Sequence, residues 1–351
     1  MKIYKNISLI LIICMTFGLV HAAGPHRVGT TAGNFLELGY GGAGVAMGDA
    51  YVSIANDISS VYWNPAGLAY MDKSGLMTDM QPFVVDIYFS MGAFAYTNPM
   101  LGTVALSFIN TSYGEEDVTT MEHQNGTGET YDGQDLSLQL SYGRKLAQWF
   151  AFGFTGKYVT SRISRTDASA FAMDFGSIVN TNFLNKTGKP GDGLNIGMSI
   201  SNYGGRLQYS GKETKERLDP SDIEGNYPYV PVQYETGEWE LPLIFRIGIS
   251  FSPILTDHQR LILTTDALHP NNNSEYINVG AEYSLKIAPV GKFYLRGGYK
   301  GIGMDDSPYG MTFGGGLKMN LLNNYRVSFD FATREIGDLG YLNSYTVGLN
   351  F

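Results

Sequence analysis

The chain has 351 residues and a formal net charge of −9, and 44% of its residues are apolar, 13% aromatic and only 16% charged. An acidic chain without a basic cluster is a poor candidate for a nucleic-acid-binding protein, because such proteins carry positive charge against phosphate. Many aromatic and glycine residues, low charge and no long apolar run after the N-terminus are instead typical of a transmembrane β-barrel.

The first 22 residues have the features of a secretory signal peptide. Lys2 and Lys5 precede an apolar run over 7–20, and Val20-His21-Ala22 resembles a small-residue cleavage site. The rival interpretation, a membrane-spanning helix, needs about 20 apolar residues, and this run is shorter. Cys14 lies in the middle of the run, which argues against a lipoprotein anchor, and cleavage after Ala22 removes the single cysteine.

Residues 23–74 do not alternate in polarity and are predicted to form a small helical plug in the barrel mouth. Their small residues allow short helical turns to pack close to a wall. Asn64 is the expected cap of a helix that begins with Pro65, and Gly67 is expected to close the turn. The candidate plug and gate residues are Gly41, Gly44, Asp49, Asn56, Asp57, Asn64, Pro65 and Ala66.

From residue 75 onward, fourteen segments alternate between apolar and polar residues, which is typical of strands with one apolar face. In one of them, Ile247 and Ile249 alternate with Arg246 and Gly248. We expect an all-β fold, a 14-stranded antiparallel transmembrane β-barrel over residues 75–351; twelve strands are the alternative, because the first segment is weak. The segments are 75–81, 87–97, 102–112, 135–145, 150–161, 168–179, 193–203, 241–252, 260–268, 275–285, 293–299, 310–318, 325–334 and 343–351.

The connections between the segments also favour a barrel. In outer-membrane barrels both termini are periplasmic, so the connections after odd-numbered strands should be long and external. The connections over 113–134 and 204–240 are long and follow odd segments, whereas 98–101 is tight; 180–192 is the exception. A soluble β-sandwich also alternates, but its strands average about 5–6 residues, and most segments here are longer.

The chain ends on an alternating strand. Tyr345, Val347, Leu349 and Phe351 lie on one face, and polar residues lie on the other. In a soluble sheet an exposed last strand invites pairing with other chains, whereas a closed barrel has no edge. A terminal Phe after alternating aromatics resembles the assembly signal of bacterial outer-membrane barrels, so Tyr345 and Phe351 are the candidate assembly residues.

Two motifs in the plug carry a resemblance to a known family. They are Gly-Gly-Ala-Gly-Val-Ala-Met-Gly-Asp-Ala at 41–50 and Trp-Asn-Pro-Ala-Gly-Leu at 63–68, and further motifs lie at 201–204, 241–248, 266–271, 278–283 and 295–299. The chain resembles the PorV/PorQ family of outer-membrane proteins, distant relatives of the FadL fatty-acid transporters, over essentially its whole mature length. The resemblance implies a 14-stranded outer-membrane barrel. In some bacteria PorV-type members accept cargo from the type IX secretion translocon and help hand it to the surface attachment machinery.

Charged residues on the predicted inner face alternate in sign between neighbouring strands. This pattern predicts a hydrated, salt-bridged lumen that supports the plug. The alternative is a polar path for a solute, although mixed signs would not select one ion. The lumen charges are Lys157, Asp174, Arg246, Asp266, Glu282, Arg296, Lys318 and Asp330.

Two long connections offer candidate binding residues. The acidic stretch over 115–132 lacks the spacing of a calcium-binding EF-hand loop, which favours a solvated loop. In the 204–240 connection, Tyr227, Tyr229, Tyr234 and Trp239 are candidate partner-binding residues, because Tyr and Trp are favoured interface anchors. The alternative is that they belong to the aromatic girdle at the membrane interface.

The motifs that carry enzyme or cofactor chemistry are weak or missing from the sequence. Gly39-x-Gly41-x-x-Gly44 matches a dinucleotide fingerprint, but no strand precedes it and no βαβ unit follows, so close packing of the plug is the better interpretation. The mature histidines lack metal-ligand spacing, and no nucleophile elbow occurs. We expect no metal, no cofactor and no enzyme activity.

The sequence therefore predicts a non-enzymatic outer-membrane barrel with a role in transport or secretion. In the PorV-like interpretation, the 204–240 connection binds a secretion-system subunit or a secreted cargo protein at the cell surface. The alternative is a FadL-like passive channel for a hydrophobic ligand, and a third possibility is a purely structural envelope barrel. Outer-membrane lipid is an expected partner, and nucleic acid is not.

Overall fold

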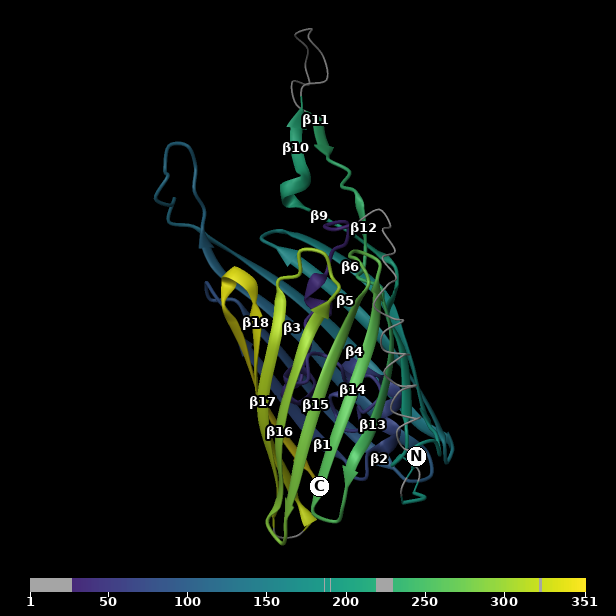
Figure 1. Cartoon of the computed structure of the whole chain (residues 1–351). Helices are drawn as coiled ribbons and strands as arrows, with labels where there is room; N and C mark the ends of the chain where they lie inside the picture. Colours follow the sequence, from purple (N-terminus) through teal and green to yellow (C-terminus); the bar gives the residue numbers. More distant parts are fainter. Residues whose placement is uncertain (1–26, 186, 190, 219–229, 322–323) are drawn as a thin grey trace, which may run out of the picture.

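Fourteen long antiparallel strands close into a barrel around short N-terminal helices, which confirms the predicted fold (Figure 1). The structure is a computed structural model that describes residues 27–185, 187–189, 191–218, 230–321 and 324–351. The predicted signal peptide over 1–22 lies outside these residues. Within the described ranges, no helix has the length and apolar character needed to cross a membrane.

The barrel wall contains the fourteen predicted strands, several of them longer than the sequence pattern indicated. Each strand pairs with its neighbour in the chain, β1 pairs with β19, and β7 pairs with β13 across an insertion, which closes the wall. The strands are β1 (Gly75–Pro82), β2 (Tyr88–Asn98), β3 (Gly102–Asp117), β4 (Thr130–Ala147), β5 (Phe150–Ile163), β6 (Thr166–Asn180), β7 (Asn195–Gly204), β13 (Ile244–Leu255), β14 (Gln259–Pro270), β15 (Tyr276–Ile287), β16 (Gly291–Ile302), β17 (Tyr309–Asn320), β18 (Arg326–Ile336) and β19 (Tyr341–Asn350).

Side chains alternate between the two faces of the wall as the sequence period predicts. In β13, Ile247 is 37% exposed on the outside, whereas Arg246 on the inside is 3% exposed. The outward positions of the other strands carry a belt of exposed Leu, Ile, Phe, Tyr and Met side chains. An apolar outer band with a polar interior is the arrangement that a membrane requires of a barrel.

The last strand completes this wall. Backbone pairs join Gly75 of β1 to Asn350 of β19, and the backbone N–H of Phe351 donates to the carbonyl oxygen of Ser74 over 2.9 Å. The ring of Tyr345 packs 5.4 Å from the ring of Phe331 on the outer face. The C-terminal residues therefore seal the seam between the first and last strands.

The facing of the wall predicts how it tolerates charge. Phe329→Arg, on the outer face of β18, should destabilise the barrel by about 2–4 kcal/mol at mid-membrane depth. Ser328→Arg, at the neighbouring inward position beside a cavity, should cost less, because repulsion from Lys318 opposite it in register costs only about 0.2–1 kcal/mol. Folding titrations of both variants in lipid vesicles check this, and equal losses would mean that the facing is wrong. Gly248 is unsuitable as an inward control, because a Cβ there would lie 2.0 Å from Oδ1 of Asp266.

The two ends of the barrel differ in their connections. One end, here the turn end, has short connections over 99–101, 256–258 and 288–290, and it holds the start of β1 and the end of β19. The opposite end, here the loop end, has the long connections after β3 and β7. The longer connection over 181–194 is an exception at the turn end.

The connection after β3 is shorter in the structure than the predicted loop over 113–134. Strands β3 and β4 continue past the wall as a ribbon, in which Glu115 pairs with Asp132 and Asp117 with Thr130, and only 118–129 is a loop. The sequence pattern does not reveal these strand extensions, because their residues are mostly polar and a ribbon in water needs no apolar face.

The predicted 204–240 connection also contains regular structure. Its elements are β8 (Arg206–Gln208), β9 (Ser210–Gly211), η4 (Lys212–Thr214), β10 (Lys215–Leu218), β11 (Val230–Gln233) and β12 (Glu238–Glu240). β8 pairs with β12, β10 pairs with β11, and β9 extends the barrel sheet at β6. The described residues of 205–240 form the outer platform, which projects from the loop end (Figure 1).

Residues 27–74 run through the barrel from the loop end to the turn end. Their short helices are η2 (Asn34–Glu37), α2 (Gly42–Ala46), α3 (Ser60–Trp63) and η3 (Pro65–Tyr70). The Asn64 side chain caps η3 by accepting from the backbone N–H of Ala66 over 3.1 Å, as predicted. Gly67 does not close this helix but lies inside it, where a Cβ would be 2.4 Å from the carbonyl oxygen of Ala55. Gly67 therefore serves close packing.

Candidate functional site

A buried ion cluster joins the plug to the wall at Asp49. The Asp49 carboxylate lies 2.6 Å from Nζ of Lys300 on β16 and 3.9 Å from Nη1 of Arg334 on β18. Arg334 also donates to the side-chain oxygen of Gln81 on β1 over 2.9 Å. All four side chains are buried. Asp49 is a predicted plug residue, whereas the other three residues of the cluster were missed, although each lies at an inward position of its strand.

A second contact lies at the seam of the barrel. The Asp79 carboxylate accepts from the hydroxyls of Ser344 and Thr346 on β19, over 2.6 Å each. The Thr346 hydroxyl in turn accepts from the backbone N–H of Gly42 in the plug over 2.7 Å. The Gln81 amide donates to Asp79 over 2.7 Å and to the plug backbone at Gly39 over 2.8 Å. The seam strands and the plug thus share one hydrogen-bond network.

Glycines allow the plug to pack closely on itself, as the sequence predicts for this motif. A Cβ on Gly44 would lie 2.5 Å from the Trp63 ring, and a Cβ on Gly41 would lie 2.9 Å from Cβ of Ser59. α2 has five residues, and no strand precedes it within the described residues 27–41, unlike a dinucleotide-binding helix. The glycines therefore pack the plug core.

Asn64 and Pro65 dock the plug onto glycines of the wall. The Asn64 amide donates to the carbonyl oxygens of Val52 in the plug, over 2.9 Å, and of Ser177 in β6, over 3.1 Å. A Cβ on Gly153 of β5 would lie 2.3 Å from the Pro65 carbonyl carbon, so that only glycine permits this approach. Both plug residues are buried. These contacts make the predicted gate residues an anchor to β5 and β6.

Lys157 and Asp174 form a buried ion pair at an irregularity in the wall. Their Nζ and Oδ2 atoms lie 2.7 Å apart, and both side chains are at most 3% exposed. Two residues of β7, Ser201 and Asn202, lie opposite Asp174 alone, which makes a β-bulge. The Asn202 backbone N–H donates to Asp174 over 2.7 Å, and its side chain accepts from Lys157 over 2.7 Å. The pair therefore replaces a hydrogen bond that the bulge removes from the ladder.

Three other predicted lumen charges meet in one group. Arg296 on β16 lies 2.7 Å from Glu282 on β15 and 2.5 Å from Asp330 on β18. These three positions lie near the plug and beside a cavity. One guanidinium on β16 thus links a carboxylate on the neighbouring strand β15 to another on β18, across β17.

The remaining predicted lumen charges are placed separately. Arg246 donates to the Ser201 hydroxyl over 2.8 Å, and Asp266 accepts from the plug backbone N–H of Val52 over 2.9 Å. Lys318 makes no ion pair within the described part of the chain. The structure thus does not gather the eight charges into one site.

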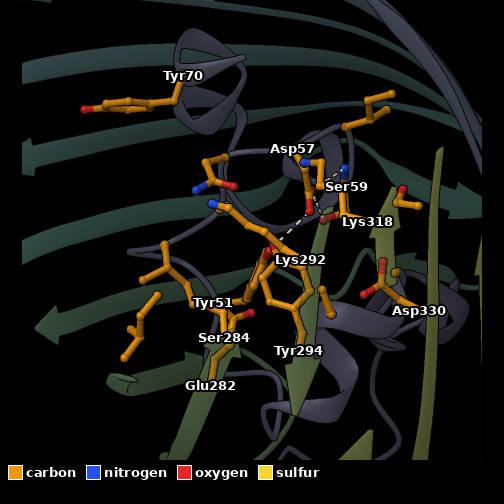
Figure 2. Close-up of a pocket in the computed structure, with 18 of the residues that line it drawn as sticks. Tyr51, Asp57, Ser59, Tyr70, Glu282, Ser284, Lys292, Tyr294, Lys318 and Asp330 are labelled. Carbon is orange, nitrogen blue, oxygen red and sulfur yellow. Dashed lines mark hydrogen bonds between the residues drawn. The ribbon is translucent and has the colours of Figure 1, made fainter. Parts of the chain in front are cut away.

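A cavity of about 360 Å³ lies between the plug and the turn end. Figure 2 shows Lys292 and Lys318 of the wall and Asp57 and Ser59 of the plug around this cavity. Asn56, another predicted plug residue, also lines the cavity. The Asp57 carboxylate accepts from the backbone N–H and the hydroxyl of Ser59 and from the Tyr51 hydroxyl. The lining is strongly polar, which does not suit a hydrophobic ligand.

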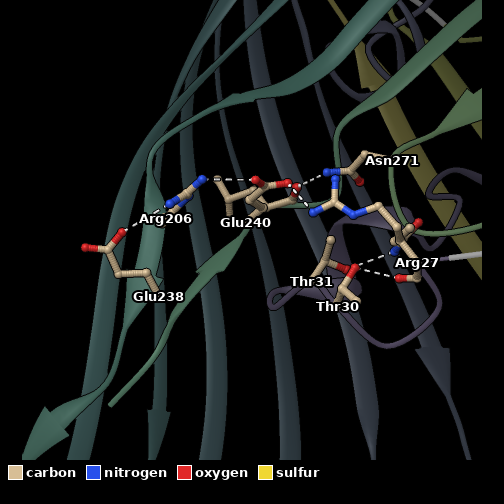
Figure 3. Close-up of polar contacts among 9 residues, drawn as sticks. Arg27, Thr30, Thr31, Arg206, Glu238, Glu240 and Asn271 are labelled. Atoms are coloured by element: carbon tan, nitrogen blue, oxygen red, sulfur yellow. Dashed lines mark hydrogen bonds and ion pairs between the residues drawn. The ribbon is translucent and has the colours of Figure 1, made fainter. Parts of the chain in front are cut away.

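The N-terminal residues of the plug bind the outer platform (Figure 3). Arg27 and Arg206 each lie 3.2 Å from the Glu240 carboxylate, and Arg206 lies 3.5 Å from Glu238. Thr31 bridges to Glu240 in parallel, and the following N–H donates to the Glu240 carbonyl oxygen over 3.0 Å. Each exposed ion pair contributes little by itself, but the backbone contacts fix where the platform stands.

Two of the predicted partner-binding aromatics lie exposed on this platform. Tyr234 follows β11 above the barrel, and Trp239 lies in β12. The Tyr234 hydroxyl donates to Glu216 over 2.6 Å, and this hydrogen bond raises the pKa of Tyr234. Tyr227 and Tyr229 lie outside the described residues. Among the residues that the structure describes, no group of His, Cys, Asp and Glu is arranged to hold a metal ion.

Solved structures of similar fold include a transporter, a channel and a FadL homologue. The chain is similar to the Ralstonia pickettii toluene transporter TbuX (TM-score 0.55, 11% identity, covering 89% of this chain and 97% of that one) and to the monoaromatic hydrocarbon channel CymD (0.56, 11%, 89% and 96%). It is also similar to a Pseudomonas aeruginosa FadL homologue (0.50, 11%, 93% and 99%). These identities show a shared fold alone. No curated protein matches the chain.

The sequence gives a more specific result. A family model described as "Type IX secretion system protein PorV" matches residues 21–269, which include the plug, the platform and most of the wall. Neither PorV proteins nor FadL-like barrels form an enzyme family. The protein is a bacterial outer-membrane barrel, and it belongs to the PorV family.

Proposed function

We propose that this barrel acts in protein secretion without catalysis, by binding a protein partner through its outer platform. In an outer-membrane barrel the long loops face the cell surface and the short turns face the periplasm. The platform therefore projects outside the cell. The observation that carries the proposal is this ordered, surface-facing platform on a member of a family described by type IX secretion.

The platform has the properties of a binding surface on a rigid scaffold. β9 joins it to β6 of the wall, and Glu240 joins it to the plug. Loops held by a rigid scaffold often carry binding function, and exposed Tyr and Trp are favoured anchors. β11, which Tyr234 directly follows, lies above the loop end and beyond the wall strands (Figure 1). This position favours contact with a protein over a place in the membrane girdle. The partner is a secretion-system subunit or a secreted cargo protein.

A passive channel for hydrophobic molecules is the second candidate, because the solved structures of similar fold include a toluene transporter and a monoaromatic hydrocarbon channel. Two features favour it less. The cavity beside the plug is lined by charged side chains, whereas sites for apolar ligands are mostly apolar. The plug is also held to the wall through Asp49, Asn64 and the Asp79 network, so its opening would break buried polar contacts.

Removal of the platform tip tests the proposal. Residues 212–234 are replaced by a short Gly/Ser linker, which is feasible because Thr236 donates to the carbonyl oxygen of Tyr209 over 2.5 Å and keeps the stems together. The barrel should still fold, since a change of loop length costs little closure entropy. Co-purification of type IX secretion subunits or secreted cargo from native membranes should fall to background.

The matched control shortens the other long loop at the same end. Residues 119–128 are replaced by the same linker between Val118 and Glu129, whose backbones are hydrogen-bonded over 2.8 Å. This control should keep full partner capture. Undiminished capture after loss of the platform tip, in a correctly folded barrel, would refute the platform as the binding surface.

A further inference from the structure

Three lysines lie directly opposite one another at the turn end of the wall. Lys286 of β15 pairs in register with Lys292 of β16, which pairs in register with Lys318 of β17. Lys286 and Lys292 share the inward parity of Glu282 and Arg296 on their strands, and Lys318 lines the interior cavity. Like charges directly opposite on neighbouring strands destabilise a sheet. Repulsion within the row therefore lowers the stability of the protein when no anion is bound.

Nearby acids offset this row only in part. Among the described residues, no ion pair involves any of the three lysines. Glu282 and Asp330 are both bound by Arg296, at 2.7 and 2.5 Å. Asp57 accepts three hydrogen bonds from its own plug segment, and Asp192 accepts from the Thr187 hydroxyl over 2.5 Å. Bonds from neutral donors leave the charges of Asp57 and Asp192 in place, but the five cations that line the open space beside the row still outnumber its four carboxylates.

That space is the cavity of about 360 Å³ below the plug. Lys292 and Lys318 extend into it (Figure 2). Arg260 of β14 and Lys145 of β4 line it from other sides, and Ser284 and Ser328 add hydroxyl donors at its edge. Its volume falls within the range of small-ligand sites.

The cavity opens toward the periplasm. Its lining includes Gln148, Gly191 and Asn350, which come from turns and a strand end at the turn end. The lysines face the lumen, away from lipid, so that a ligand reaches them from periplasmic solution. Lys is a compact point charge with three donors and is a common ligand for phosphate.

We propose that this vestibule binds a small phosphate-bearing anion from the periplasm, held by Lys292 and Lys318. Arg260 and Lys145 supply further positive charge around it, and Ser284 and Ser328 supply hydrogen bonds. The site is independent of the outer platform, because it lies at the opposite end of the barrel. A phospholipid headgroup offers the same chemistry, and the inward direction of the lysines favours a soluble source.

Titration of the purified full-length barrel in neutral detergent with inorganic pyrophosphate tests the site. We expect saturable binding by calorimetry above a chloride control of equal ionic strength. Lys292→Gln with Lys318→Gln should weaken binding by about tenfold or more, since each lysine would give a charged hydrogen bond. Lys212→Gln with Lys215→Gln, the same charge change on the outer platform, should bind as the native protein does.

A thermal measurement separates binding from a structural role. Without the anion, the Lys292→Gln/Lys318→Gln variant should melt higher than the native barrel at low salt, because the repulsion is removed. A rise in melting temperature with pyrophosphate in detergent that requires the two lysines assigns the site to a soluble anion. A lysine-dependent rise in melting temperature in phosphatidylglycerol nanodiscs, absent in phosphatidylcholine nanodiscs and absent with pyrophosphate in detergent, assigns a lipid headgroup. Absence of saturable binding in both settings, or equal binding by the double variant, would overturn the proposal.

Discussion

Asp49→Ala should destabilise the folded protein by about 3–5 kcal/mol, the cost of removing one partner from a buried ion pair. The substitution leaves Lys300 and Arg334 buried without the carboxylate that now lies 2.6 and 3.9 Å from them. Because Asp49 belongs to the plug and both cations belong to the wall, the substitution should weaken the attachment of the plug to the wall. Denaturant unfolding in detergent measures the loss, and limited proteolysis should show faster cleavage within the plug.

Two controls make the Asp49 result specific. Asp338→Ala removes the same charge from an exposed turn and should change stability by no more than about 0.5 kcal/mol. Asp49→Ala combined with Lys300→Met should recover part of the loss, since one uncompensated charge is then gone. A plug that remains protease-resistant, in a single variant as stable as the native protein, would show that this cluster does not hold the plug.

Asp174→Ala should cause a loss of similar size, about 3–5 kcal/mol, in the wall instead of the plug. Lys157 would stay buried without its partner, and the backbone N–H of Asn202 would lose its acceptor. The bulge in β7 depends on this carboxylate, because the bulge takes that N–H out of the regular ladder. Unfolding titrations in lipid vesicles measure the effect.

The apolar double variant distinguishes a charge effect from a packing effect. Lys157→Met with Asp174→Leu removes both buried charges and should be more stable than Asp174→Ala alone. Asn202 would still lack its acceptor, so recovery should be incomplete. If the double variant were as unstable as the sum of two independent losses, the ion pair would not be the source of the effect.

The sequence predicts the wall well because a membrane imposes a simple rule. Lipid outside and polar contacts inside require period-two alternation in every strand, so segments such as the one around Ile247 are visible without a structure. The cap formed by Asn64 is also local, since it depends on residues next to it in the chain. Both predictions hold because the interactions that decide them repeat at short, fixed spacing.

The contacts between plug and wall are not visible in this way. Arg334 and Gln81 are hydrogen-bonded although 253 positions separate them in the chain. The residues around each of them do not indicate which distant residue it will contact. The bulge at Asn202 requires a positive φ of 63°, which polarity alternation does not reveal. The platform strands were missed because strands of two to four residues are too short to show a periodic pattern of polarity.

Photo-cross-linking in intact cells tests most directly the claim that the platform binds a secretion partner. A photoreactive residue is placed at Tyr234, which is 61% exposed on the platform, or at Tyr345, which is 50% exposed on the lipid-facing wall. We expect position 234 to cross-link to a type IX secretion subunit or a secreted cargo protein, and position 345 to give no such product. No protein cross-link from position 234, or equal yields from both positions, would contradict the claim.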